Sequence, residues 1–219
     1  MTAAAFTAAW SRGPEPMLVQ LWLTLRDSLQ GWSLAGWATL AVAVMTATIL
    51  STVAEYDQSL PLATRATART SLVLFLAAFM SSTLYRVLPN RRGRWLLNNR
   101  RYLGVAFAGS HAVHGVMVVA LSYWLELEYE LLVLAGGGLG YAFIAAMTVT
   151  SFDRAADRLG PRRWRLLHTT GAYYLWGIFA FAYWGHAADS LAYAAVFGFL
   201  LACLLLKLSV KLAQVRGGR

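Results

Sequence analysis

Long apolar runs separated by short polar segments dominate the chain. Six of these runs come close to the roughly 20 residues that an α-helix needs to cross a bilayer. They lie at residues 31–53, 70–88, 102–124, 131–151, 166–184 and 191–208. Since each run is long enough to span the hydrocarbon core, the pattern predicts an all-α integral membrane bundle of six transmembrane helices.

A shorter amphipathic segment precedes the first run. Its apolar residues recur at helical spacing, at Leu18, Leu21, Trp22 and Leu25. This spacing predicts an interfacial helix at residues 17–30 that lies along the membrane surface. The expected organisation has three parts: an N-terminal tail with the interfacial helix (1–30), the six-helix domain (31–210) and a cytoplasmic basic tail (211–219).

Composition supports a membrane protein. Hydrophobic residues make up 58% of the 219 residues and charged residues only 13%, with a mean hydropathy of +0.52. Soluble domains carry about 25% charged residues. This composition therefore excludes a soluble globular protein. The length leaves no room for a second folded module beside the membrane domain.

The charges are segregated along the chain, which has a net charge of +9. Arginines cluster at residues 91–101 and 154–165, after the second and fourth runs, and the C-terminal tail is also basic. Acidic residues gather between the other runs, most densely in the segment LELEYE at 125–130. The positive-inside rule predicts that both termini and the basic loops face the cytoplasm. We expect no nucleic-acid partner, because the aromatic or groove-reading context is missing.

Histidines supply the candidate chemistry. His111 and His114 lie deep in the third run, three residues apart and so on one helix face, and His168 lies near the start of the fifth. An imidazole at bilayer depth is costly, and neutral imidazole is a common ligand of haem iron. His186 follows the fifth run as a boundary residue.

Other interpretations of these residues stay open. An intramembrane histidine can simply bond a carbonyl or hydroxyl group on a neighbouring helix. Zinc bound by His111 and His114 would need two further ligands, and no carboxylate or thiolate is spaced to supply them. The glycines between Gly136 and Gly140 lack the Lys-Ser/Thr ending of a phosphate loop, which favours close helix packing.

Two short stretches resemble the ferric reductase-like transmembrane domain family, and within it the haem-binding membrane subunit of the bacterial methionine sulfoxide reductase system. RRYLGVAFAGSHAVHG resembles the family's third span, where Arg100, Arg101, Leu103 and Gly104 match and His114 falls at a ligand position. LGPRRWRLLHTTGAYYLW resembles the entry to its fifth span, with His168 on the family's histidine. The resemblance implies a six-helix, multi-pass protein of the bacterial inner membrane.

One position departs from the family. A second histidine usually follows thirteen residues after the one at 168, and Phe181 stands there in this chain. His114 therefore lacks the partner that the family pairs with it across one haem. The resemblance then leaves three outcomes: one haem held by a distorted pair that includes His111 or His168, a five-coordinate haem on the third span, or no haem.

The function that the resemblance implies is electron transfer through one b-type haem held by His114 with help from His111 or His168. The protein would be the membrane electron-transfer subunit of an oxidoreductase. Arg100, Arg101 and Arg165 could pair with haem propionates or steer an anionic flavin partner. The chain has no dinucleotide fingerprint, so electrons would come from a separate flavin reductase or from quinone. The alternative is a haem-less six-helix scaffold or assembly subunit.

Overall fold

Residues 28–217 are described by a computed structural model, and within that range the chain is entirely helical apart from short connections. The interfacial helix expected at 17–30 lies almost wholly outside it. The seven described helices are α3 (Gly31–Thr52), α4 (Tyr56–Val87), α5 (Arg91–Trp124), α6 (Leu131–Val149), α7 (Asp153–Leu159), α8 (Pro161–Trp184) and α9 (Leu191–Gly217). Five of them, α3, α4, α5, α6 and α9, are long and apolar enough to cross a membrane.

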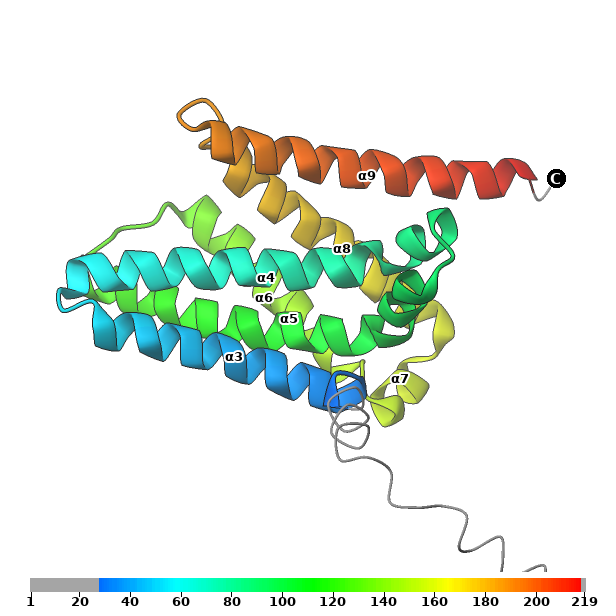
Figure 1. Ribbon diagram of the computed structural model, residues 1–219, viewed down its shortest axis with the longest axis horizontal. Helices are drawn as coiled ribbons and strands as arrows, with labels where there is room; N and C mark the ends of the chain where they lie inside the picture. The colour runs from blue at the N-terminus through cyan, green and yellow to red at the C-terminus, as the bar shows by residue number, and fades with distance from the viewer. Residues whose placement is uncertain (1–27, 218–219) are drawn as a thin grey trace, which may run out of the picture.

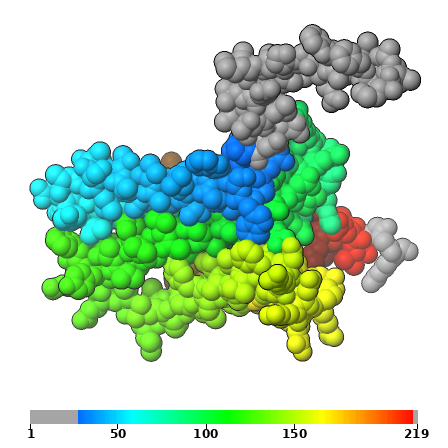
Figure 2. Space-filling model, turned by 90° about the horizontal axis from the view of Figure 1, so that it is seen from below, coloured from blue at the N-terminus to red at the C-terminus, as the bar shows by residue number. Residues whose placement is uncertain are grey.

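Helices α3, α4, α5 and α9 lie roughly along one common axis (Figure 1). Helices α3, α4 and α5 form a tight three-helix group, in which α4 and α5 share the most extensive interface. Helix α6 lies beside α5 on the side away from α3 (Figure 2). Helix α8 crosses the bundle obliquely (Figure 1) and contacts both α6 and α9. The arginine-rich segments and the C-terminus lie at one end of the bundle, and the acidic 125–130 segment lies at the other (Figure 1).

Two segments expected as loops are helical. Helix α4 begins at Tyr56, so the loop expected before residue 70 is wrong. Pro61 lies inside this helix and has no backbone N–H to donate to the Asp57 carbonyl, four residues earlier. Asp57 is exposed in the first turn of α4, so its carbonyl is close to water. Helix α5 begins at Arg91, because the Asn90 side chain accepts a hydrogen bond from the Gly93 N–H at 2.9 Å and caps the helix. The basic segment 91–101 therefore extends α5 beyond the apolar run.

The chain after the fourth run also differs from the expectation. The segment between the fourth and fifth runs contains the short helix α7, and α8 already begins at Pro161, a residue favoured in a first helical turn. Helix α8 is not among the five described helices apolar enough to span a membrane. The basic tail expected from residue 211 is not separate, because α9 continues to Gly217.

Small residues bring two pairs of helices together. Gly140 of α6 lies against the Tyr174 ring of α8, and Gly136 lies beside the Tyr174 hydroxyl, which donates to the Gly136 carbonyl at 2.8 Å. Gly137 and Gly138 have open space beside them, so only half of this glycine-rich segment serves packing. In the other pair, Gly109 of α5 lies directly against Thr39 of α3.

Gly109→Ala should destabilise the fold, whereas Gly36→Ala should not. A Cβ atom at Gly109 would meet the Thr39 side chain well inside contact distance, and a β-branched threonine has little freedom to move away. Overpacking of this kind costs about 1–3 kcal/mol. A Cβ at Gly36 meets nothing within 4 Å, so the better helix propensity of alanine should hold or raise stability there. Thermal unfolding in detergent measures both variants, and equal melting temperatures would contradict the packing described.

Candidate ligand site

A cavity of about 560 Å³ opens at the basic end of the bundle, between α4, α5, α6, α8 and α9. Ligand pockets typically have volumes of about 300–1,000 Å³. Its inner wall is apolar and largely aromatic, and its outer wall carries the cationic side chains of Arg100, Arg101, Arg165, Lys207 and Lys211. The cavity therefore combines an apolar interior with a positively charged mouth.

Phe75 and Phe107 line the inner end of the cavity, and Phe179 packs against both rings. We call these three phenylalanines the aromatic layer. Each is buried, and each comes from a different helix, α4, α5 and α8. Their ring centroids lie 5.3 to 6.2 Å apart, the spacing of packed aromatic rings. The layer separates the cavity from the half of the bundle that holds His111 and His114.

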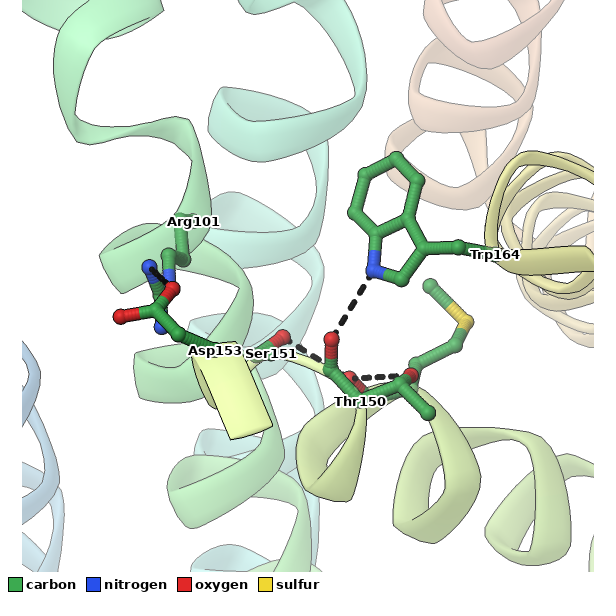
Figure 3. Close-up of polar contacts among 6 residues, drawn as sticks. Arg101, Thr150, Ser151, Asp153 and Trp164 are labelled. Atoms are coloured by element: carbon green, nitrogen blue, oxygen red, sulfur yellow. Dashed lines mark hydrogen bonds and ion pairs between the residues drawn. The ribbon is translucent and has the colours of Figure 1, made fainter. Parts of the chain in front are cut away.

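His168 is the only histidine in the described cavity wall. Its ring stacks on Trp164 at a centroid distance of 4.1 Å, and its Nε2 lies 2.9 Å from the Thr150 hydroxyl. Trp164 in turn donates its indole N–H to the Thr150 carbonyl at 2.9 Å (Figure 3). The end of α6 and the first turns of α8 thus fix this imidazole from two sides.

Arg101 crosses from α5 to the start of α7. Its guanidinium donates to the Asp153 carboxylate at 2.8 Å (Figure 3), and it lies 5.4 Å from the centroid of the Trp32 ring. Trp32 stacks on Phe152 and so brings α3 into the same contact. Because Asp153 is 84% exposed, the ion pair itself contributes little to stability, and its effect is to fix the direction of Arg101.

The remaining cavity cations lack acidic partners. The pair of Arg101 with Asp153 is the only ion pair within residues 28–217, and Asp153 is the only acidic residue in the described cavity wall. Arg100, Arg165, Lys207 and Lys211 are therefore four positive charges around one opening with no counter-charge among the described residues. Such a site favours a ligand that carries negative charge on an apolar body.

The structure does not bring His111 and His114 into this cavity. They lie on α5 beyond the aromatic layer, with ring centroids 5.1 Å apart, and His111 contacts Phe107 and Phe179. His114 Nδ1 lies 3.2 Å from the Thr67 hydroxyl of α4. His111 Nδ1 is buried, with no hydrogen-bond partner among the described residues. Neither ring is paired with a histidine of another helix in the described range.

The residue that faces His111 from α8 is Phe179 rather than Phe181. Phe181 is 71% exposed on the outer face of α8. Positions two residues apart point in different directions on a regular helix, since each residue turns the chain by about 100°. A histidine at position 181 would therefore point away from α5 in this helix. His186 is exposed beyond the end of α8, where its ring lies 5.2 Å from that of Tyr193.

Lys207 is a site residue that the sequence-based expectation missed. The sixth apolar run was expected to end just past it, and its charge was assigned to the basic C-terminal segment. A signal was nevertheless present, because Lys207 interrupts an apolar run that continues with Leu208 and Val210. Cys203 of α9 is buried within the hydrophobic core.

Comparison of the chain with protein-family models, with curated proteins and with solved structures finds no match.

The charge of the cavity should control which reagents enter it. We expect Ser82→Cys, in the cavity wall, to react on the order of tenfold faster with a negatively charged than with a positively charged methanethiosulfonate, each rate normalised to a free thiol. The control is Ser122→Cys, beside Glu126 at the opposite end, where the preference should reverse. Both variants are made with Cys203→Ser. Raised salt should shrink the difference, and equal rates in the Ser82→Cys variant would contradict a cationic cavity.

Proposed function

We propose that this chain is a multi-pass protein of the bacterial inner membrane with six spans and both termini in the cytoplasm. Five apolar helices support the membrane location. Helix α8 would be the sixth span, since its 24 residues extend about 36 Å at 1.5 Å per residue and it connects the two ends of the bundle. The collected arginines at one end support the orientation.

Within this fold, the function that the site supports best is binding of one b-type haem for electron transfer. The single observation that carries this proposal is the cavity, which joins an apolar interior, an imidazole and unpaired cations. Haem is an apolar macrocycle with two carboxylates and an iron that accepts imidazole ligands. The residues present therefore fit the group, which would supply one-electron redox chemistry.

His168 is the candidate iron ligand in the cavity, and Arg100, Arg101 and Arg165 would face the propionates. Trp164 and Thr150 orient the imidazole, as supporting groups do for metal-bound histidines. The sequence resemblance instead assigned the iron to His114, but that ring and His111 lie beyond the aromatic layer. Because neither ring lies in the described cavity wall, His114 is the less favourable ligand, and His168 would be the one histidine that holds the iron.

An electron donor would be a separate protein or a quinone. No dinucleotide fingerprint is present in the sequence, and the basic end of the bundle presents exposed arginines at 91, 92, 94, 162 and 163. Such a surface suits the acidic face of a flavin reductase. The chain would then act as the membrane subunit of an oxidoreductase, with flavin contributed only by the partner.

A haem-less scaffold is the second candidate. The observation that favours it is that both histidines to which the resemblance assigns iron are already engaged, His168 with Thr150 and His114 with Thr67. Satisfied imidazoles of this kind are ordinary interhelical contacts in membrane proteins. In that case the six-helix shell would hold another subunit in place.

Purified protein should show a Soret band that shifts on reduction with dithionite. His168→Ala should lose most of the haem per polypeptide, and His186→Ala should retain it, because His186 is exposed beyond α8. His114→Ala separates the two ligand assignments, since retention of haem in this variant favours His168 and loss favours the resemblance. A protein spectrum without a Soret band, even after reconstitution with hemin, would refute the proposal and favour the scaffold.

Topology reporters should place the basic end in the cytoplasm. A fusion after Arg94 should be active with a cytoplasmic reporter, and a fusion after Glu128 with a periplasmic one, because the arginines of residues 91–101 resist translocation. A fusion after Gly185 tests α8 as a span and should also read as periplasmic. Periplasmic activity after Arg94 would overturn the orientation, and cytoplasmic activity after Gly185 would remove α8 from the spans.

A further inference from the structure

Lys207 turns inward from α9 toward α4. Its Nζ donates to the Phe79 carbonyl oxygen at 2.6 Å and lies 4.3 Å from the centroid of the Phe79 ring. The side chain is half-buried and forms part of the cavity wall. It therefore delivers a positive charge from the last helix to the same cavity that α5 and α8 line.

This position is unusual for a lysine in an apolar helix. Lysine near a membrane surface normally extends its chain toward water. Helix α9 continues ten residues beyond Lys207, about 15 Å, and Lys211 one turn later is already exposed. Lys207 instead keeps its ammonium group beside the protein interior, where an unpaired charge is costly.

The contacts of Lys207 leave part of its bonding capacity unused. An ammonium group has three donors, and the Phe79 carbonyl takes one of them. The Phe79 ring adds a cation–π contact, which supplies no negative charge. No acidic residue in the described part of the chain pairs with Lys207. An anion that pairs with Lys207 would therefore come from outside the described residues, and the cavity is the open space beside this side chain.

We propose that Lys207 binds a carboxylate of the ligand in this cavity, a propionate in the case of haem. This inference rests on the proposed function and adds a ligand-binding residue to it. The ammonium group keeps its bond to the Phe79 carbonyl and directs its free donors to the anion. The main contacts of α9 with the rest of the bundle are with α4 and α8. A bond from Lys207 would fix α9 to the ligand as well.

The test compares protoporphyrin IX with its dimethyl ester, both free of iron, by fluorescence titration of the full-length protein in detergent. The ester keeps the apolar ring and lacks the carboxylates, and neither probe depends on an imidazole–iron bond. We expect the wild-type protein to prefer the free acid. Lys207→Met should lower this preference on the order of tenfold, the factor for one lost charge-assisted hydrogen bond. Lys207→Arg should restore most of it.

Arg216→Met is the matched control, because Arg216 is a cation of the same helix outside the described cavity wall. It should keep the wild-type preference. Comparing the ratio of the two affinities between variants cancels any difference in how the two porphyrins enter detergent. The role of Lys207 would be overturned if Lys207→Met kept the full wild-type preference for the free acid. It would also be overturned if Arg216→Met lost as much of that preference as Lys207→Met. Binding of both porphyrins without preference would overturn it too, yet leave the cavity proposal intact. Absence of any porphyrin binding would overturn both.

Discussion

The interface between α4 and α5 is the constraint on which the rest of the bundle depends. Each of these helices exceeds thirty residues, and they meet along a line of small and hydroxyl side chains. Ser71 and Ser110 are both fully buried and lie 2.9 Å apart through their hydroxyl groups, and Thr67 reaches His114. In the apolar interior of a bilayer, these contacts between polar groups favour one register of α4 against α5. That register sets the heights of Phe75 and Phe107, and so the depth at which the cavity ends.

The positions of the helices were predicted from the sequence more accurately than the residues at which they begin and end. Apolar runs define where a helix can meet lipid, but they do not define where it starts, because a helix continues into water when capping and packing allow. Asn90 caps α5 well before the start expected at residue 102, and buried Ser59 and Ala63 pack the first turns of α4 where a loop was expected. Hydropathy cannot detect either effect, since both depend on a neighbouring helix or on a single side-chain bond.

The candidate site was predictable in part. Arg100, Arg101, Arg165 and His168 were all expected at a cofactor, and the structure gathers them around one cavity. His111 and His114 were expected there too, and the structure sets them apart, because Phe107 closes the cavity one turn before His111 on α5. The contribution of Lys207 was hidden for another reason. Lys207 and its hydrogen-bond partner Phe79 are 128 residues apart in the sequence. No local sequence pattern predicts which face of α9 packs against α4.

In a bilayer, the aromatic layer would also shape the electric field. Water and ions in the charged cavity would bring the potential of the basic side inward as far as Phe75 and Phe107. The transmembrane voltage would then fall over the remaining thickness of the bundle rather than over the whole bilayer, and the local field would be correspondingly stronger. A full elementary charge that crosses the membrane gains or loses about 2.3 kcal/mol for each 100 mV. An electron moved from the cavity to the opposite face would be exposed to most of that energy, so membrane voltage would favour its transfer in one direction.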